Sequence, residues 1–478
     1  MGLTTLRRSS RRGFFKGLRR LSLAVGFGFL AHAFPTLAQS QLVALQVNGP
    51  VSNRLNLVFL SEGYTTNQLG QFLVDATNTL TALLSAEPYQ EYQNYFNGFA
   101  IPVASNESGS DHPNAGLYRD TYFNSNYDPD SDLLITIPPD DADTNYDHGQ
   151  GKVDALLQSH LPNCQLPVLL VNDVVRGGSD GAGQIAIAAN ASGSSVFAIH
   201  ESGHVLSNLG DEYTSAYPGF PDTEEPNTTT QTNLSLIKWN AWIDTNSTPV
   251  PTPPTAAYQE AVGLFEGAHY HPTGWYRPQL NCAMGNFSSP FCAVCREALV
   301  LAIYQHVRPV DQFTPVLTNL SASSTQLLSF DLSVLHPATH ELSVQWFTNA
   351  IPVAGATNVD FQIEAGSLGS GNELVSARVW DATPMVRNDP EGRLSQTLIW
   401  NVGVGAANLL LDAPEWRTDG SFSFRVTGNA PAGFVIQSSA DLACWHPVAT
   451  NTLVAGEFLY TNAAADVAGQ FFRAQTPP

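Results

Sequence analysis

The first two thirds of the chain mix two hydrophobic periods, one typical of helices and one typical of strands. Apolar residues recur every three or four positions over residues 67–86, as on one face of a helix. A second helix is predicted over residues 194–209, begun by Ser192 or Ser194 and burying one apolar stripe. That stripe consists of Val196, Ile199, Leu206 and Leu209. Apolar runs predict strands at 55–60, 99–104, 132–137, 168–171 and 185–189.

Beyond about residue 312 the pattern changes to short segments of alternating polarity. It predicts an immunoglobulin-like β-sandwich over residues 313–403 and a small β module over residues 404–478. Neither part has a prominent cluster of ionisable residues, so we expect spacers or modules that bind a cell surface or substrate. The strands predicted there are 326–334, 341–347, 374–380, 421–427, 433–438 and 458–461.

Length and composition indicate several domains. A chain of 478 residues is too long for one core. Hydrophobic residues make up 43% and charged residues 13%, as in a globular protein with few charges. The 37 glycines and 31 prolines indicate many turns and a β-rich fold. For residues 39–312, where helices and strands mix, we expect an α+β domain.

The first 38 residues resemble an export signal. Ser10-Arg11-Arg12-Gly13-Phe14-Phe15-Lys16 resembles a twin-arginine motif, and Thr36-Leu37-Ala38 offers a cleavage site before Gln39. The apolar run between them spans about 14 residues, short of the ~20 that cross a bilayer, so cleavage is favoured over a retained anchor. We therefore expect export to the periplasm, the outer surface or the medium.

The charge excludes some partners. Seven of the 21 basic residues lie within the first 20 positions, so their removal leaves 14 basic against 42 acidic residues, a net charge of −28. Such a surface repels nucleic acid and anionic membranes, and we expect no nucleic-acid partner.

The sequence His200-Glu201-Ser202-Gly203-His204 carries the chemistry. On a helix, residues four apart lie on one face, so His200 and His204 converge on one ion and Glu201 lies beside it. This is the pattern of a hydrolytic zinc site in which the glutamate is the general base. The predicted strand at 185–189 directly precedes this helix, and we expect it at the sheet edge, where it pairs with extended substrate.

A catalytic zinc site needs a third protein ligand, and Asp211 is the best candidate. On a continued helix Asp211 would lie roughly 10 Å beyond His204, so the chain must first turn back. Asn208 and Gly210 tolerate the left-handed conformation that ends a helix. Glu212 is the second choice. Glu224 and Glu225 suit a thermolysin-like arrangement, but Pro226 disfavours a ligand-bearing helix there.

The five cysteines leave several pairings open. Cys282, Cys292 and Cys295 cluster in one short stretch, and Cys164 is the remaining cysteine of the same predicted domain. In an oxidising compartment these four allow three disulfide connectivities. Cys292-x-x-Cys295 is also half of a redox or zinc motif, which no nearby C-x-x-C or histidine pair completes.

Several motifs in order resemble the zinc-dependent IgA peptidase family of metallopeptidases. The resemblance covers roughly residues 54–305 and begins with the H-E-x-G-H sequence at 200–204. Its other parts are Leu209-x-Asp211-Glu212-Tyr213, Lys238-Trp239-x-x-Trp242-Ile243, Pro249-Val250-Pro251-Thr252-Pro253, Gly263-Leu264-Phe265-Glu266-Gly267-Ala268-x-Tyr270, Tyr276-Arg277-Pro278, Cys282-x-Met284, Phe291-Cys292-x-Val294-Cys295-Arg296, Ser105-x-Glu107-Ser108-Gly109 and Arg119-x-Thr121-x-Phe123.

This resemblance implies a metzincin-like domain with a methionine turn beneath the zinc, and Met284 fits that role. The usual metzincin pattern has glycine and then histidine or aspartate seven and ten residues after the first histidine. This chain has Ser207 and Gly210 there, so the resemblance supports Asp211, at eleven, as the ligand. Activated water, with Glu201 as general base, then hydrolyses a peptide bond. Candidate donors to the oxyanion are Tyr213, Tyr276 and Arg277.

The sequence thus predicts an exported zinc endopeptidase that acts on protein or peptide substrates. Two alternatives stay open: a non-catalytic surface-binding protein, and a zinc amidase acting on cell-wall peptides. The alternating acids at 128–132 suggest a calcium site, but they lack the glycine and distal glutamate of an EF-hand loop, which favours a solvated acidic turn.

Overall fold

The computed structural model describes residues 40–138, 149–180, 184–405, 409–428, 433–453, 457–462 and 470–475. The predicted export signal lies outside these residues, as does the side chain of Asp132 in the acidic turn. None of the described helices is long and apolar enough to cross a membrane.

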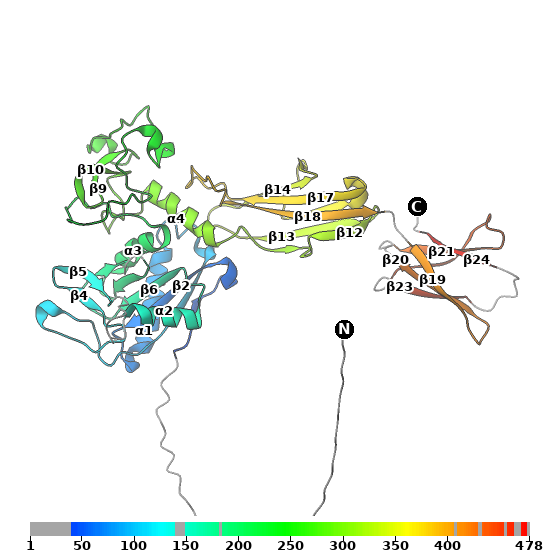
Figure 1. Cartoon of the computed structure of the whole chain (residues 1–478), viewed down its shortest axis with the longest axis horizontal. Helices are drawn as coiled ribbons and strands as arrows, with labels where there is room; N and C mark the ends of the chain where they lie inside the picture. Colours follow the sequence, from blue (N-terminus) through cyan, green and yellow to red (C-terminus); the bar gives the residue numbers. More distant parts are fainter. Residues whose placement is uncertain are drawn as a thin grey trace, which may run out of the picture. The chain divides into compact units, whose positions relative to one another are not determined.

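An eight-stranded sheet organises the first part of the chain (Figure 1). Its central strands are parallel, with Leu57 opposite Leu166 and Val168 opposite Ala186, whereas the outer pairs β1–β3 and β4–β5 are antiparallel. In sheet order the strands are β1 (Val43–Gln46), β3 (Phe96–Ile101), β2 (Leu55–Glu62), β6 (Leu166–Val171), β8 (Ala186–Ala189), β7 (Gly178–Ser179), β5 (Ser131–Thr136) and β4 (Asn126–Asp128).

Helices cover both faces of this sheet, which explains why every residue of β2 is buried. Leu57 and Phe59 share one core with α1 (Leu69–Leu84) and α4 (Ala293–His306). Val58 and Leu60, which point the other way, share a second core with α2 (Gly149–His160). Helix α3 (Ser195–Ser207) contacts α1, α4 and β8. Mixed helices and sheets agree with the predicted α+β class.

Two predictions about α3 and its preceding strand are wrong. Strand β8 lies inside the sheet, between β6 and β7, because its pairing partners come from segments distant in sequence. Of the predicted apolar stripe, Leu209 is buried, but Val196, Ile199 and Leu206 are only half-buried. The buried residues of α3 itself include Phe197, Ala198 and Gly203. The helix is enclosed from several sides, so its apolar stripe does not mark its most buried face. Ser194 occupies the N-cap position but forms no capping hydrogen bond.

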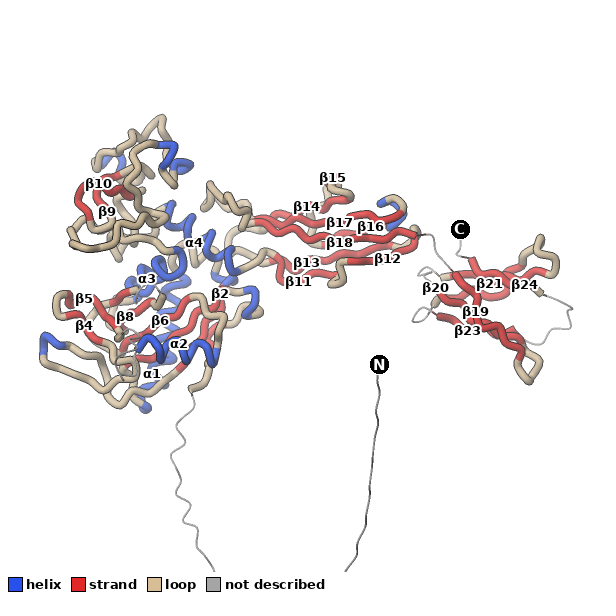
Figure 2. Tube along the Cα trace, viewed as in Figure 1, coloured by secondary structure: helices blue, strands red, loops and turns tan. Residues whose placement is uncertain are grey.

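Two further sheets follow, and Figure 2 shows strands and loops with one short helical turn in this part. They meet through aromatic rings: the Phe330 ring lies 5.8 Å from that of Trp346 and 5.0 Å from that of Trp400. The immunoglobulin-like topology stays a prediction. One sheet consists of β11 (Val310–Thr314), β13 (Leu327–Val334) and β16 (Asp360–Glu364). The other consists of β12 (Asn319–Ser323), β18 (Ser395–Gly405), β17 (Gly371–Trp380), β14 (Ser343–Thr348) and β15 (Ile351–Pro352).

The last described strands form two three-stranded sheets around a core that includes Phe424, Phe434 and Tyr460. The first of these sheets consists of β19 (Leu409–Trp416), β20 (Phe422–Gly428) and β23 (Glu457–Asn462). The second consists of β22 (His446–Asn451), β21 (Phe434–Ser439) and β24 (Phe471–Gln475). The remaining elements are the hairpin β9 (Phe265–Ala268) and β10 (His271–Arg277), and eight short 3-10 turns: Val51–Asn53, Thr66–Gln68, Gln93–Tyr95, Pro113–Ala115, Leu234–Leu236, Asn240–Trp242, Ala256–Tyr258 and Ala365–Leu368.

A buried polar network joins the residues before β11 to those after it. Asp381 accepts hydrogen bonds from the hydroxyls of Tyr92 and Tyr304, both 2.7 Å long. His340 lies between two carboxylates, with Nδ1 2.8 Å from Glu91 and Nε2 2.7 Å from Asp381. These contacts connect parts that the sequence assigns to separate domains.

Candidate metal centre

Helix α3 ends in the chain reversal that the position of Asp211 requires. Asn208 adopts a left-handed conformation, with φ 52° and ψ 40°. The amides of Asn208 and Leu209 donate to the carbonyls of His204 and Gly203, at 2.9 and 3.2 Å. This C-cap turns the chain back along the helix.

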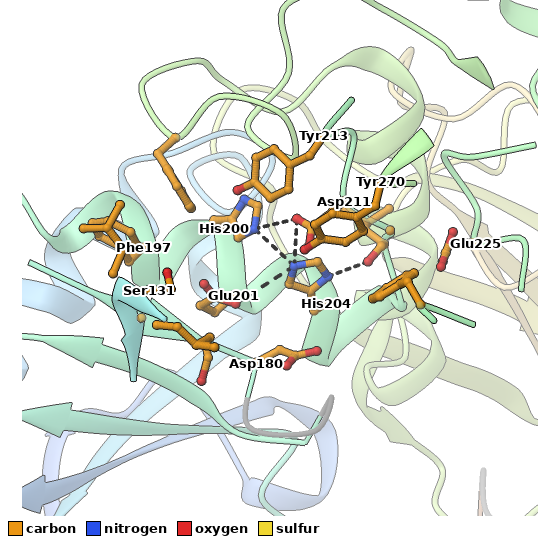
Figure 3. Close-up of a pocket in the computed structure, with 18 of the residues that line it drawn as sticks. Ser131, Asp180, Phe197, His200, Glu201, His204, Asp211, Tyr213, Glu225 and Tyr270 are labelled. Atoms are coloured by element: carbon orange, nitrogen blue, oxygen red, sulfur yellow. Dashed lines mark hydrogen bonds and ion pairs between the residues drawn. The ribbon is translucent and has the colours of Figure 1, made fainter. Parts of the chain in front are cut away.

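Three donor atoms converge as a result (Figure 3). The Nε2 atoms of His200 and His204 lie 3.1 Å apart, and Asp211 Oδ1 lies 3.1 Å from the first and 3.5 Å from the second. A tetrahedral zinc ion with bonds of about 2.0–2.1 Å has ligand atoms roughly 3.3 Å apart. The three distances therefore fit one zinc ion.

Backbone carbonyls fix both imidazoles in this orientation. His200 Nδ1 donates to the carbonyl of Ala283 at 2.8 Å, and His204 Nδ1 donates to that of Leu209 at 2.6 Å. Because each Nδ1 donates to a carbonyl, each Nε2 faces the common point and can offer its lone pair to a metal ion once it has lost its proton.

The two carboxylate oxygens of Asp211 have different environments. Its Oδ2 accepts a hydrogen bond of 2.5 Å from the hydroxyl of Tyr270. Its Oδ1 is buried and accepts no well-aligned hydrogen bond from the described residues, although it faces both Nε2 atoms. A cation at the common point would satisfy this oxygen, so the donor set fits a metal ion.

The electrostatics favour a cation as well. Burial opposes the charge of His204, but the Asp211 and Glu201 carboxylates raise its pKa to about 9. Burial likewise opposes the charge of Asp211, but the two imidazoles hold its pKa below the ordinary value. Burial is the largest effect on Glu201 and raises its pKa to about 7, while both imidazoles lower it. The Glu201 Oε2 atom lies 4.0 Å from His204 Nε2, beside the convergence point.

Met284 lies beneath the histidine helix. Its side chain is fully buried, and a Cβ atom on Gly203 would approach its Sδ to 3.0 Å. The glycine of the H-E-x-G-H sequence therefore lets the helix rest directly on the methionine. The Met284 carbonyl accepts a hydrogen bond from the Glu212 amide at 2.9 Å, which ties this turn to the loop that carries Asp211.

Of the three residues predicted as donors to the oxyanion, one lines the cavity beside the metal ligands and two have other contacts. Tyr213 lines the cavity, its ring stacked 6.1 Å from that of His200, and its hydroxyl enters no hydrogen bond among the described residues. Tyr276 pairs through its backbone with Thr229. Arg277 donates through Nη1 to the Glu212 carbonyl at 2.6 Å, a role in holding the loop.

The other carboxylates considered as the third metal ligand do not lie with the two histidines. Glu212 Oε1 accepts from Asn227 at 2.9 Å. Glu224 binds Thr229, Thr230 and Lys238. Glu225 lines the cavity but pairs with Thr228 and His269.

Sequence reasoning assigned no role to Tyr270, the donor to Asp211. This tyrosine lies 59 positions further along the chain, and only the motif around 263–270 pointed to its neighbourhood. The cavity measures about 530 Å³, and its lining includes His200, Glu201, His204, Asp211, Tyr213 and Tyr270. Apolar side chains line part of it: Leu133, Leu134, Phe197 and Phe287.

The mixed helix-and-sheet fold and this donor set agree with the metallopeptidase class that the family comparison supports. The family model described as IgA Peptidase M64 matches residues 43–257 and 254–303, more than half of the chain, and the chain therefore belongs to this peptidase family. No curated protein matches the chain.

Among solved structures, the chain is similar to fibronectin(III)-like modules of Clostridium thermocellum CbhA, at 8% identity over 34% of this chain and 83% of that one, with a TM-score of 0.16. Three N-terminal domains of the bacteriophage RB49 outer capsid protein Hoc are 12% identical over 32% and 56%, with a TM-score of 0.18. Domains A168–A170 of titin are 11% identical over 33% and 55%, with a TM-score of 0.15. Likenesses this weak carry no argument about this chain.

Proposed function

We propose that this protein is a zinc endopeptidase whose metal ligands are His200, His204 and Asp211. The observation that carries the proposal is the convergence of three donor atoms, 3.1 to 3.5 Å apart, beside a buried glutamate in a member of a peptidase family. A bound zinc ion supplies Lewis acidity, which polarises a carbonyl group and makes water acidic enough to lose a proton near neutral pH.

The residues of the chain perform the remaining steps. Glu201 takes a proton from the attacking water at its carboxylate and gives it to the leaving amine. Its burial, at 5% exposure, keeps bulk water from competing for that proton. The Tyr213 hydroxyl, in the same cavity, enters no hydrogen bond with another described residue, and we assign it the donation of a hydrogen bond to the developing oxyanion.

The cavity suits a peptide substrate. Leu133 and Leu134 are exposed on β5, and Phe197 and Phe287 face the same space. These groups offer apolar contacts to side chains that flank a scissile bond. The family description names IgA, but nothing in the cavity chemistry selects that protein, so the proposal is limited to proteins and peptides.

Replacing Glu201 with Gln tests the mechanism. We expect the variant to keep its zinc and to lose about 10²- to 10⁴-fold in the rate of peptide hydrolysis, because the general base is removed and the ligands are not. Glu266→Gln is the control, since Glu266 is an exposed carboxylate on β9. A Glu201→Gln protein that cleaves as fast as wild type would refute the mechanism.

The substrate panel should contain folded proteins, short peptides and cell-wall peptide fragments. Hydrolysis of proteins or peptides is the expected result. Cleavage of cell-wall fragments alone would make the protein an amidase, and binding without any hydrolysis would make it a surface-binding protein.

We also propose export through the N-terminal segment, with cleavage before Gln39. The support is the sequence of residues 1–38 alone. Amino-terminal sequencing of the protein recovered from outside the cytoplasm should begin at Gln39. An intact amino terminus there would contradict the proposed cleavage.

A further inference from the structure

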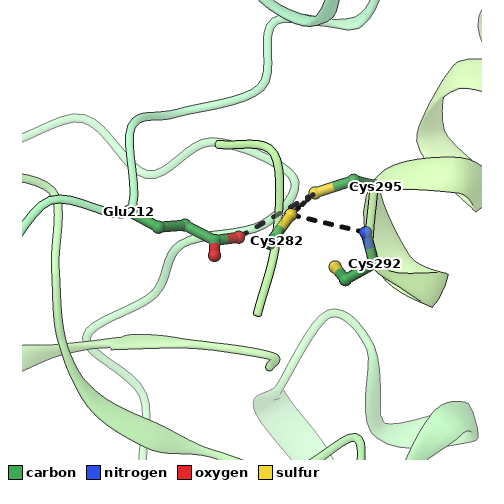
Figure 4. A group of neighbouring side chains, drawn as sticks. All are labelled: Glu212, Cys282, Cys292 and Cys295. Carbon is green, nitrogen blue, oxygen red and sulfur yellow. Dashed lines mark hydrogen bonds between the residues drawn. The ribbon is translucent and has the colours of Figure 1, made fainter. Parts of the chain in front are cut away.

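Figure 4 shows a second group of side chains that can bind a metal ion, distinct from the group of His200, Glu201 and His204. The second group consists of Glu212, Cys282, Cys292 and Cys295, all at most 3% exposed. One ligand atom of each lies within 4.8 Å of those of the other three. The Sγ atoms of Cys282 and Cys295 are 3.5 Å apart, and Cys295 Sγ is 3.9 Å from Glu212 Oε1. In a tetrahedral zinc site with Zn–S bonds of about 2.3 Å, sulfur atoms are roughly 3.8 Å apart.

Two parts of the chain supply these ligands, the loop after α3 and the stretch from residue 282 to the start of α4. Glu212 follows Asp211 in the loop after α3. Cys282 precedes Met284 by two residues. Cys292 is the N-cap of α4, and Cys295 lies in the first turn of that helix. In the fold, Cys292 and Cys295 lie beside Cys282 and Glu212, which complete a set of four possible metal ligands.

Burial raises the pKa of Glu212, Cys282 and Cys295, whereas at Cys292 burial is outweighed by hydrogen bonds from the other two thiols, which lower its pKa. The Cys292 amide donates to Cys282 Sγ at 3.4 Å, and Cys292 is the N-cap of α4, where the helix end favours negative charge. Glu212 Oε2 is buried and has no hydrogen-bond donor among the described residues. A buried carboxylate oxygen without a partner costs free energy, which a bound cation would remove.

We propose that Glu212, Cys282, Cys292 and Cys295 bind a second, structural zinc ion. On binding, three Zn–S bonds and one Zn–O bond replace the bonds of the ion to water, and the protons carried by the three thiols and the Glu212 carboxyl pass to solvent with the released water. Three sulfur donors select a metal such as zinc over calcium or magnesium. Four protein ligands leave no open position for water, so this ion is structural.

This ion would brace the catalytic centre. It would fix Glu212, the neighbour of Asp211, to the turn that contains Ala283 and Met284. The Ala283 carbonyl orients His200, and Met284 supports the helix at Gly203. Loss of the structural ion is therefore expected to loosen the catalytic ligands as well.

A disulfide is the competing arrangement for these thiols. Three clustered cysteines form at most one disulfide, which would leave one thiol over and Glu212 Oε2 without a partner. The fourth cysteine of the predicted set, Cys164, does not join them. It packs against the second core of the sheet, on the side of α2. The expectation that Cys164 completes a set of four disulfide-forming cysteines is therefore wrong.

The test is elemental analysis and zinc X-ray absorption on the full chain and on a His200→Ala, His204→Ala double variant. Neither substitution touches the cysteine group. We expect two zinc ions in wild type and one in the variant, the latter with sulfur neighbours at about 2.3 Å. A zinc-free double variant would overturn the second site.

The two proposals fail in different ways. One zinc ion in wild type with nitrogen and oxygen neighbours only would refute the cysteine site and leave the catalytic one. One zinc ion with mostly sulfur neighbours would support the cysteine site and refute the zinc assignment at the histidines.

Thiol counting in denaturant with a chelator supplies an independent measurement. All five cysteines should react, whereas one disulfide would leave three (5 − 2) and overturn the proposal. Cys282→Ser should lose the zinc ion that has sulfur neighbours, and the control Cys164→Ser should keep both ions. If Cys282→Ser does not fold, the double histidine variant still decides the question.

Discussion

Removing the Tyr270 hydroxyl should weaken zinc binding without altering any proposed ligand. Burial and the Asp211 carboxylate raise the pKa of Tyr270 far above its ordinary value, so the phenol keeps its proton and donates to Asp211 Oδ2. That hydrogen bond orients the oxygen Oδ1 toward the two imidazoles. Tyr270→Phe removes it and leaves the ring packing intact.

The magnitude follows from two estimates that agree. A hydrogen bond to a charged group contributes about 1.5–3 kcal/mol. Loss of a partner that orients a metal ligand costs about 10- to 100-fold in affinity, which is ~1.4–2.7 kcal/mol. We therefore expect the zinc dissociation constant of Tyr270→Phe to rise by about 10- to 100-fold.

Competition with a chromophoric zinc chelator at fixed pH measures this constant. The matched control is Tyr217→Phe, because the Tyr217 ring lies 5.7 Å from that of Tyr270 but is 63% exposed and does not bond Asp211. The control should bind zinc like wild type. Equal affinity in Tyr270→Phe and wild type would refute Asp211 as a ligand oriented by Tyr270.

Two further predictions test packing and charge. Gly203→Ala gains about 1 kcal/mol of helix propensity, but its Cβ would press on Met284 at 3.0 Å, an overpacking cost of about 1–3 kcal/mol, so urea unfolding should show a net loss of stability. Gly70→Ala in α1, where a Cβ meets nothing within 4 Å, should instead stabilise, and a similar gain in Gly203→Ala would contradict the close contact. Burial lowers the pKa of His340, but its two carboxylate partners outweigh this and raise the pKa above the ordinary value. The stabilisation of the fold by protonated His340 is complete below the ordinary histidine pKa and is lost as the pH rises through the raised pKa of His340. Unfolding free energies measured across this pH range should therefore fall more in wild type than in His340→Gln. Parallel pH profiles of the two proteins would contradict that assignment.

Local spacing was sufficient to predict that the side chains of His200, His204 and Asp211 lie close together. The distance between residues four apart on a helix brought His200 and His204 together, and the rise per residue required a reversal before Asp211. The structure has that reversal at Asn208. The strand at 168–171 and the helix at 67–86 also follow from local periodicity, and β6 and α1 occupy nearly those residues.

Features that depend on distant segments escaped the sequence. The interior position of β8 depends on pairing with β6 and β7, which no local pattern encodes. Tyr270 reaches Asp211 only because the β9–β10 hairpin folds back over the loop after α3. The grouping of Glu212 with three cysteines likewise needs the turn at 282–284 to meet the start of α4.

Anomalous diffraction at the zinc absorption edge tests the central claim most directly. Crystals of the zinc-loaded protein should give an anomalous peak at the point shared by His200 Nε2, His204 Nε2 and Asp211 Oδ1. The peak should lie about 2.0–2.2 Å from each atom. A zinc-replete crystal with no peak among these three atoms would contradict the account.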